Sequence, residues 1–467
     1  MSNEKRGSFT GSIGFVLAAA GSAVGLGNLW RFPCLAAKNG GGVFLLVYII
    51  LALTFGFALM TTEIAIGRKT KRSPIKAYGD LKKGFGFLGY LSSIVPFIIF
   101  PYYCVIGGWV TKYTIDYLDG RGWELVSDSY FGSFITSPWS PIFWCAVFMI
   151  ICAVVVFAGV DKGIEKFSKV LMPALVVLII AVAIFALTIN GNDGRTAMDG
   201  LKIYLVPDFT GMTFNRFIGI VVDAMSQIFY SMSLAMGIMI TYGSYMRKED
   251  NMVKSVNRIE IFDTAIAFLA GVIMIPVVYA FQGYEGLKAS GPSLLFKALP
   301  KVFSQMGWIG DVVGSVFFIL VVFAALTSAV SLMEAIVSVV MDKLGWERKK
   351  SCWAVLLVSG VIALITCLGY TVWYFDYKLP NGSIGQILDI LDYVSNNILM
   401  PIVALITCIL VGWVIKPKSV IDEVQANGEK FGRKGLYNVM VKFVAPVCLV
   451  VIFLQAFGVI DWLLGKI

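Results

Sequence analysis

Long apolar runs dominate this sequence and decide what it can fold into. A helix needs about 20 mostly apolar residues to cross the ~30 Å hydrocarbon core of a bilayer. Eleven such runs follow one another along the 467 residues, at roughly 13–36, 42–66, 91–117, 141–160, 168–189, 217–245, 259–281, 311–341, 352–372, 385–414 and 440–463. We therefore expect an all-α membrane protein with eleven transmembrane helices.

The composition excludes several other classes of protein. Hydrophobic residues make up 58% of the chain and charged residues 14%, whereas about 25% of a soluble protein is charged. The runs do not alternate between apolar and polar residues as the strands of a membrane barrel do. The sequence has no His, and its eight Cys form no CxxC pair, which excludes Ser-His-Asp triads and His-ligated metal sites. We expect that the protein is not an enzyme.

Lysine and arginine are unevenly distributed between alternate loops. The N-terminus and every second loop carry 25 of them, and the loops of the other side carry 10. Positively charged loops remain in the cytoplasm, so we place the N-terminus there. With an odd number of spans the C-terminus lies outside, and we expect the protein in the plasma membrane.

Two of the eleven runs are interrupted by small and polar residues at mid-membrane. The first reads GSAVGLGN over Gly21–Asn28, and the sixth reads SMSLAMG over Ser231–Gly237. Glycine disfavours a helix by about 1 kcal/mol, and unwound backbone at membrane depth is tolerated only where it is buried in protein or lines a cavity. A packing seam of small residues is the alternative interpretation.

The interrupted spans are the first and the sixth, so each begins a unit of five helices. Interrupted helices at matching positions of two inverted halves indicate the binding site of a transporter. We expect a single transporter domain over residues 1–467, with spans 1 and 6 unwound and a 5+5 inverted repeat. Repeat one covers about 13–189 and repeat two about 217–414, and an extra helix covers about 440–463.

Polar residues within other spans favour a cation site. Span 7 contains Asp263, and no Lys or Arg lies at the same depth, so its partner should be a cation from outside the protein. Thr327 and Ser328 in span 8 can simply bond the preceding helical turn, but hydroxyls, carbonyls and a carboxylate together suit a hard ion. The sequence contains no GxxxxGKS/T motif, which argues against an ATP-driven pump.

Six segments spread over spans 1 to 8 carry distinctive motifs. They are AGSAVGLGNLWRFP (Ala20–Pro33), NGGGVF (Asn39–Phe44), KGIEKF and MP (within Lys162–Pro173), QIFYSMSLAMG (Gln227–Gly237), ITYGSYMRK (Ile240–Lys248) and FAALTS (Phe323–Ser328). Together they resemble the neurotransmitter:sodium symporter family, in particular its bacterial amino-acid transporters with eleven spans. The resemblance implies sodium-coupled import of a hydrophobic or aromatic L-amino acid by alternating access. A symporter for a small amino acid such as Gly or Ala is the alternative, and an ion channel or amino-acid sensor a more remote one.

The resemblance implies two sodium sites and a substrate pocket. The first sodium site would comprise Ala23, Asn28, Ser231 and Asp263. The second would comprise Gly21, Val24, Ala324, Thr327 and Ser328. The pocket would be lined by Ala23, Leu26, Gly27, Ile99, Tyr103, Tyr230, Ser231, Ser233, Met236, Ser328 and Leu332. In this family the substrate carboxylate meets the amides of Leu26 and Gly27 and the Tyr103 hydroxyl.

The resemblance also implies gates on both sides of the pocket. Arg31 and Asp392 would pair when the outside closes, and Arg6 and Asp342 would pair on the cytoplasmic side. Two aromatic residues, Phe9 and Tyr245, would lie beside the inner pair. The cytoplasmic end of span 5 would unwind at Gly163 and Pro173.

Three positions depart from the usual pattern of the family. Asp263 stands where Asn is usual, and its charge can replace the chloride that some relatives need, so we expect chloride not to be required. Some bacterial members carry a Glu one turn later, where this chain has Ala267. Amine transporters carry an Asp at the position of Gly25, so the substrate should bring its own carboxylate. Ala235 replaces a common Gly and leaves the shape of the pocket around Met236 open.

Overall fold

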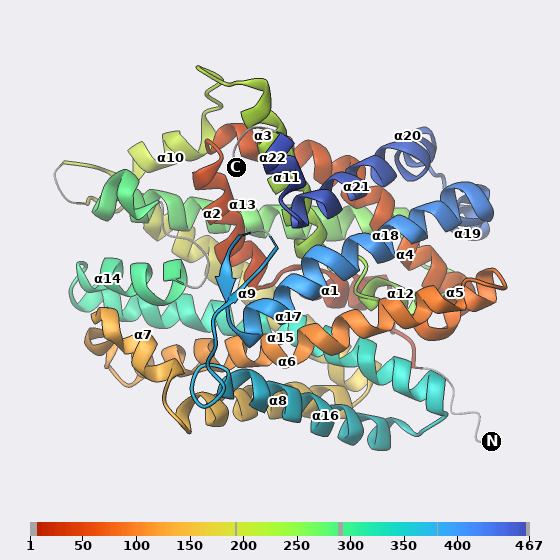
Figure 1. Cartoon of the computed structure of the whole chain (residues 1–467), viewed down its shortest axis with the longest axis horizontal. Coiled ribbons are helices and arrows are strands. Elements are labelled where there is room, and N and C mark those ends of the chain that lie inside the picture. The colour runs from red at the N-terminus through yellow and green to blue at the C-terminus, as the bar shows by residue number, and fades with distance from the viewer. Residues whose placement is uncertain (1–6, 192–193, 288–292, 381, 464–467) are drawn as a thin grey trace.

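Long helices that lie roughly alongside one another dominate the fold (Figure 1). The computed structural model describes residues 7–191, 194–287, 293–380 and 382–463. In those ranges nine helices are long and apolar enough to cross a membrane, or ten if the bent pair Ser12–Ala23 and Gly27–Lys38 forms one span. The predicted all-α membrane class is confirmed, whereas the structure does not establish a count of eleven spans.

The helices that match the predicted spans follow the apolar runs closely. They are α1 (Ser12–Ala23) with α2 (Phe32–Lys38), α3 (Gly42–Leu51) continuing into α4 (Phe57–Thr70), α6 (Gly86–Leu118), α8 (Ser140–Phe157), α9 (Lys166–Leu187), α11 (Phe214–Ser231) with α12 (Ile238–Tyr245), α13 (Met252–Gly286), α15 (Trp308–Leu344), α16 (Arg348–Leu368), α17 (Ile387–Asp392) continuing into α18 (Met400–Ile409), and α20 (Lys434–Val439) continuing into α21 (Ala445–Ala456).

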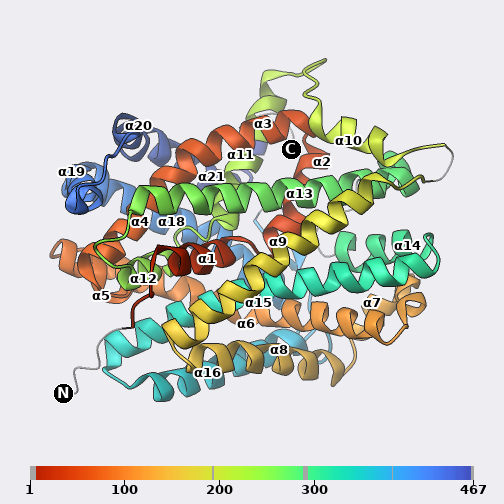
Figure 2. The ribbon, with the colours of Figure 1, turned by 180° about the vertical axis from the view of Figure 1, so that it is seen from behind.

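Short elements connect the long helices at the two ends of the molecule. They are α5 (Pro74–Leu81), α7 (Asp128–Ile135), α10 (Ala197–Leu205), α14 (Leu299–Ser304), α19 (Lys418–Val424), α22 (Val459–Leu463) and the antiparallel strands β1 (Tyr377–Lys378) and β2 (Ile384–Gly385). Helices α7, α10 and α14 lie at one end, and α5, α19 and α20 lie at the other (Figures 1 and 2). The lysine-rich connections that carry α5 and α19 therefore share one end of the bundle.

The sixth predicted span explains the difference in span count. Helix α11 ends at Ser231 and α12 begins at Ile238, and the six residues Met232–Gly237 between them are not helical. Helix α11 has 18 residues and α12 has 8, and neither is among the described helices that are both long and apolar enough to span a membrane. The interruption predicted from the motif SMSLAMG is therefore present in the structure.

Helices α6 and α15 form the inside of the bundle, and α8, α9 and α16 lie nearer its surface. In the most apolar stretch of α6 and of α15, 78% of the residues are buried, against 39% in α8 and α16 and 33% in the helix Val160–Leu187 that contains α9. The exposed apolar residues of the outer helices are suited to contact lipid. The interrupted helix of α1 and α2 packs against α9, α13 and α15, so its break is buried in protein.

Candidate functional site

The first helix break covers Val24–Leu26. Val24 leaves the helix in an extended conformation, with φ −75° and ψ 101°, and the helical segments on the two sides are bent by 54°. The amide oxygen of Asn28 accepts a hydrogen bond from the Gly25 amide at 3.1 Å. This local turn leaves several backbone carbonyls at the end of α1 without helical partners, so they can bind other groups.

The second helix break contains three residues with positive φ. These are Ser233, Ala235 and Gly237, with φ of 52°, 59° and 71°. Left-handed backbone is unfavourable for residues with a Cβ atom, so surrounding contacts must hold it. The amide of Ala235 donates to Oε1 of Glu63 on α4 at 2.6 Å, and both residues are buried. Glu63 is not among the residues predicted from the sequence.

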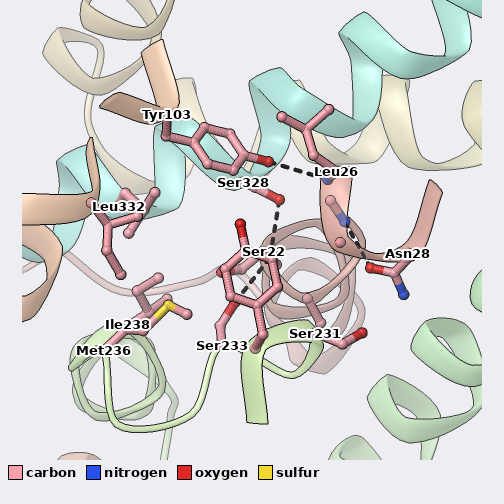
Figure 3. A pocket seen from close by; sticks show the side chains of 15 residues that line it. Ser22, Leu26, Asn28, Tyr103, Ser231, Ser233, Met236, Ile238, Ser328 and Leu332 are labelled. Carbon is pink, nitrogen blue, oxygen red and sulfur yellow. Dashed lines mark hydrogen bonds between the residues drawn. The ribbon is translucent and has the colours of Figure 1, made fainter. Parts of the chain in front are cut away.

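The residues that flank the first break contact the second break and the helix before it, although they are about 200 residues apart in the sequence. The hydroxyl of Ser233 donates to the carbonyl of Ser22 at 3.0 Å, and the two hydroxyls lie 3.2 Å apart. The side chain of Gln227 donates to the carbonyl of Gly27 at 3.0 Å. Figure 3 shows Ser22 and Ser233 close to each other.

A cavity of about 350 Å³ lies between the two breaks. All eleven residues predicted for the substrate pocket line it, and the structure adds Ser22, Gly25, Asn28 and Ile238. None of the described lining residues carries a charge. The side chains of Met236, Ile238 and Leu332 gather on one side, opposite Leu26 and Asn28 (Figure 3). The cavity thus has an apolar side and a polar side.

The polar side presents the backbone amides of the first break. The amide of Leu26 donates to the hydroxyl of Tyr103 at 3.3 Å, so this hydroxyl lies beside the amide at which the substrate carboxylate is predicted to bind. A Cβ atom added to Gly25 would lie 2.6 Å from Oγ of Ser328 and 3.0 Å from the Tyr103 hydroxyl oxygen. Gly25 therefore allows these two hydroxyls to approach the backbone.

Asp263 lies at the centre of a buried cluster of polar side chains. Its Oδ1 accepts hydrogen bonds from the amide of Asn28 at 2.8 Å and from the hydroxyl of Ser231 at 2.7 Å. Tyr48 on α3 donates to Oδ2 at 3.2 Å, a contact that the sequence analysis missed. Three residues of the predicted first sodium site are thus in direct contact, and Ala23 lines the adjacent cavity.

The orientation of the Asn28 side chain differs from the predicted one. Its NH₂ group faces the Asp263 carboxylate, and its oxygen accepts from the Gly25 amide. The prediction used this oxygen as a ligand to sodium. In this conformation the Asn28 NH₂ group takes the place of a cation as the partner of the carboxylate.

The residues of the predicted second sodium site also come together. The hydroxyl of Ser328 lies 3.3, 3.1 and 3.2 Å from the carbonyl oxygens of Gly21, Ser22 and Val24. The hydroxyl of Thr327 lies 3.1 Å from the carbonyl of Ala324, and a Cβ atom at Gly21 would lie 3.1 Å from Thr327. One hydroxyl proton cannot satisfy three carbonyls at once, so this oxygen cluster suits a hard cation. The described residues contain no group of three or more His, Cys, Asp or Glu that could hold a metal, and the oxygens gathered at this predicted site are neutral.

The predicted outer gate is not paired in this structure. The guanidinium of Arg31 lies over the ring of Tyr230, 5.3 Å from its centre. Asp392 accepts hydrogen bonds from the Tyr102 hydroxyl at 3.0 Å and from the Asn396 amide at 2.6 Å. Arg31 and Asp392 thus have separate partners, and the contacts of Asp392 come from α6 and from its own helix.

The predicted inner gate is described only in part. Arg6 lies outside the described residues, so its pairing with Asp342 is not seen. Asp342 accepts from the Ser73 amide at 2.7 Å. Phe9 is buried, its amide donates to the Tyr245 carbonyl at 3.2 Å, and the two rings meet edge to face at 6.2 Å. The aromatic part of the predicted gate is therefore in place.

A buried ion pair beside Tyr245 was not predicted from the sequence. The Tyr245 hydroxyl donates to Glu334 at 2.7 Å, and Arg348 forms an ion pair with the same carboxylate. The signal was available, because Glu334 is a carboxylate within an otherwise apolar run. This pair joins α15 to α16 and to the end of α12.

Span 5 is helical at its N-terminal end in this structure. The helix runs from Val160 to Leu187 and includes both Gly163 and Pro173. A Cβ atom at Gly163 would lie 2.1 Å from the carbonyl oxygen of Val155, so this glycine allows a close approach of the backbone. The predicted unwinding at Gly163 and Pro173 stays a prediction.

The fold and the site define a multi-pass membrane transporter with a binding cavity between two interrupted helices. The sequence matches the model of the "Sodium:neurotransmitter symporter family" over residues 6–133 and 135–462. This chain belongs to the sodium:neurotransmitter symporter family, as the motifs in spans 1 to 8 predicted.

Relatives from all domains of life show the same relationship. A sodium-dependent transporter of Bacillus subtilis, YhdH, is 34% identical, with 99% of this chain and 100% of the relative covered. A sodium-dependent transporter of Methanocaldococcus jannaschii is also 34% identical, and the match covers 98% of this chain and 92% of the relative. The human sodium- and chloride-dependent GABA transporter 2 is 24% identical, and the match covers 90% of this chain and 75% of the relative. The crystal structure of MhsT in complex with L-phenylalanine matches with a TM-score of 0.84 and 34% identity, covering 97% of this chain and 100% of that one.

Proposed function

We propose that this sodium-dependent transporter is a symporter that imports a hydrophobic or aromatic L-amino acid by alternating access. The observation that carries the proposal is the uncharged cavity between the two helix breaks, with one polar and one apolar side. The amides of Leu26 and Gly27 and the Tyr103 hydroxyl would hold the substrate carboxylate. The apolar wall that includes Met236 and Leu332 would hold the side chain. The L-phenylalanine bound to MhsT supports this class of substrate.

The lining also argues against other amino acids. A charged side chain buried without a partner costs several kcal/mol, so Lys, Arg, Asp and Glu should be rejected. A small substrate such as Gly or Ala is the second candidate, because little free space remains between the side chains that line the cavity. Met236 can adapt its shape to larger side chains, which favours the first candidate.

We propose two sodium sites beside this cavity. The first comprises Ala23, Asn28, Ser231 and Asp263, and the second Gly21, Val24, Ala324, Thr327 and Ser328. Since the substrate carboxylate would complete the first site, ion and substrate would each strengthen the binding of the other. Binding at this site requires Asn28 to turn its oxygen from Gly25 toward the ion.

The transport cycle follows from the same groups. Arg31 would leave the Tyr230 ring and pair with Asp392 when the outside closes, and Arg6 and Asp342 would pair when the inside closes. The N-terminus would lie in the cytoplasm and the C-terminus outside the plasma membrane. The two repeats of about 13–189 and 217–414 would move against each other, with the extra helix of about 440–463 outside them.

Uptake into proteoliposomes tests the proposed substrate class. We expect saturable uptake of labelled leucine that requires an inward sodium gradient, and competition by Trp, Tyr, Phe and Ile but not by Lys, Arg, Asp or Glu. Preference for Gly or Ala over Leu and Trp would overturn the hydrophobic class and favour the second candidate. Undiminished uptake without sodium would overturn the coupling.

The variant Met236→Phe tests the assignment of the apolar wall. The larger ring reduces the space for the substrate side chain, so preference should shift from aromatic toward smaller aliphatic amino acids. Leu332→Met, which keeps the wall apolar and similar in volume, serves as the matched control and should keep the wild-type order. An unchanged order in Met236→Phe would place the substrate side chain elsewhere.

Replacing chloride by gluconate tests the role of Asp263 as a built-in negative charge. We expect uptake by the wild type to change little, because the carboxylate already balances the sodium charge. In Asp263→Asn the charge is removed, and a chloride requirement is expected to appear. A strong chloride dependence of the wild type would contradict this role.

A further inference from the structure

A hollow of about 930 Å³ opens where spans 10 and 11 meet the connection that carries α19. It lies at the end of the molecule that also carries α5 (Figure 1). Its lining includes Lys416, Lys418, Lys434 and Lys442. Asp422 is the one acidic residue among the described lining residues. The hollow is therefore strongly basic.

The positive charge of this hollow is not neutralised within the described part of the chain. None of the four lysines is within ion-pair distance of a described carboxylate. Lys416, Lys418 and Lys434 are exposed and Lys442 is half-buried. Lys442 lies eight residues into the helix Lys434–Ala456, about 12 Å from its start. A lysine at such a depth needs an anionic partner or must extend to the membrane surface.

The surface next to the lysines is apolar. Trp413, Val439 and Phe443 are 59%, 51% and 55% exposed. The rings of Trp413 and Phe443 meet edge to face at 5.7 Å, and the indole of Trp413 donates to the carbonyl of Lys442 at 3.1 Å. Exposed tryptophan beside lysine is typical of the boundary between headgroups and acyl chains. The basic hollow therefore adjoins an exposed apolar surface, an arrangement suited to the boundary between headgroups and acyl chains.

We propose that this hollow binds the phosphate headgroup of an anionic phospholipid of the adjacent leaflet. The four lysines would surround the phosphate, and the acyl chains would lie along Trp413, Val439 and Phe443. Basic pockets between transmembrane helices are suited to such headgroups. A soluble phosphate would satisfy the lysines but would leave the adjoining apolar surface unused, so we assign the site to a lipid.

The connection that forms the hollow also makes polar contacts with α4 and α13, which lie in the substrate-binding part of the bundle. Arg68 of α4 pairs with buried Glu423 at 2.9 Å. The carboxylate of Glu429 accepts from the amides of Met252 and Val253 at the start of α13, at 2.8 and 2.7 Å. Helix α13 carries Asp263. A lipid that fixes this connection therefore stabilises the folded bundle around the proposed sodium site.

Lipid retention tests the proposal on the full chain in nanodiscs of phosphatidylcholine with or without phosphatidylglycerol. We expect native mass spectrometry to find phosphatidylglycerol retained by the wild type, and the thermal midpoint to rise with its content. The variant Lys416→Gln, Lys418→Gln, Lys434→Gln and Lys442→Gln should lose most of both effects. Each lysine near an anionic surface contributes about fivefold in affinity, so retention should fall at least tenfold.

A matched variant removes four exposed lysines outside the hollow at the same end, two after α5 and two in the first turn of α16. These are Lys82, Lys83, Lys349 and Lys350, each changed to Gln, and this variant should retain lipid as the wild type does. Equal retention by the two quadruple variants would overturn the proposal. If the first variant does not fold, two double variants are compared instead. Lys416→Gln with Lys418→Gln should retain less lipid than Lys349→Gln with Lys350→Gln.

A third arm separates a lipid from a soluble anion. Inorganic phosphate is added to protein in pure phosphatidylcholine at the concentration that phosphatidylglycerol has in the mixed discs. We expect no rise of the thermal midpoint that depends on the four lysines. A rise equal to that given by phosphatidylglycerol would overturn the assignment to a lipid and make the hollow a site for soluble anions.

Discussion

The two helix breaks that enclose the cavity are held in different ways. The first, Val24–Leu26, is short, and its backbone is contacted by neutral groups, the hydroxyls of Ser328 and Tyr103. The second, Met232–Gly237, is longer, contains left-handed residues, and has one backbone amide bound to the carboxylate of Glu63. Left-handed backbone is unfavourable for residues with a Cβ atom, so the bond to Glu63 is needed to hold the second break. The difference indicates that the partners of the first break can be exchanged for ligands, whereas the second break is a fixed support.

Substitutions in the two breaks should therefore have different consequences. Changes around the first break should alter the binding of sodium and substrate while the protein still folds. Changes around the second break should alter stability first and binding second. Asp263 contacts both sides, through Asn28 next to the first break and Ser231 next to the second, so its loss should have the largest effect.

Asp263→Ala should abolish sodium-dependent uptake. The substitution removes the carboxylate that accepts from Asn28 and Ser231, and hydrogen bonds to charged groups contribute about 1.5–3 kcal/mol each. We therefore expect the sodium affinity, measured as the sodium dependence of substrate binding, to fall about ten- to a hundredfold or more. Asp80→Ala, which removes an exposed carboxylate of α5, is the control. Wild-type sodium affinity in Asp263→Ala would remove this residue from the first site.

Gly25→Ala should weaken both sodium and substrate binding without unfolding the protein. The new Cβ atom would lie 2.6 Å from Oγ of Ser328 and must displace it from the carbonyls of the second proposed sodium site. We expect about a tenfold loss of affinity for each, as one or two hydrogen bonds are lost. Binding is measured by isothermal titration in detergent.

Gly79→Ala is the control for this substitution, because its Cβ atom would make only an ordinary contact of 3.6 Å on the surface helix α5. It should leave both affinities unchanged. If Gly25→Ala lowers the thermal midpoint strongly but leaves both affinities intact, the first break is structural and the comparison between the breaks fails.

Glu63→Ala should lower stability more than sodium affinity. The substitution leaves the buried amide of Ala235 without an acceptor, which costs about 1–3 kcal/mol, and the left-handed segment loses its support. The thermal midpoint in detergent measures this loss. Glu63→Gln keeps an acceptor oxygen and is the matched control, so it should be close to the wild type. Equal losses in both variants would show that the carboxyl group itself, rather than one acceptor, is needed.

Much of this site could be predicted because its residues are costly in a membrane. Glycines and hydroxyl residues in the middle of two spans, and Asp263 within a third, are unfavourable there unless they have a function. The structure brings the residues of both predicted sodium sites together and places all eleven predicted pocket residues around one cavity. Residue type and depth indicated the two helix breaks and a cation site at Asp263, whereas the full sets of sodium and pocket residues were implied by the resemblance to the family.

The features that could not be predicted depend on which side chains meet. Tyr48 reaches Asp263 only because α4, into which α3 continues, packs against α13. Nothing in the apolar surroundings of Tyr48 marks it in the sequence. The stacking of Arg31 on Tyr230 depends on a conformational state rather than on composition. Glu63 is different, because a carboxylate within an apolar run is itself a signal. The span count was uncertain because six non-helical residues divide span 6 into α11 and α12, and neither of these helices is long and apolar enough to count as a span.

Ala235→Gly should have the smallest effect. The direction in which the thermal midpoint changes tests whether backbone strain is stored in the second break. Ala235 has φ of 59°, and left-handed backbone costs a residue with a Cβ atom about 1–2 kcal/mol. Glycine removes this cost but gains freedom in the unfolded chain, worth about 0.5–1 kcal/mol. The net result should be a rise of the thermal midpoint by a degree or two, with unchanged sodium affinity. Glycine retains the backbone amide through which the second break is held, so this support should remain. A fall of the thermal midpoint would show that packing of the Ala235 methyl group contributes more than the backbone strain costs.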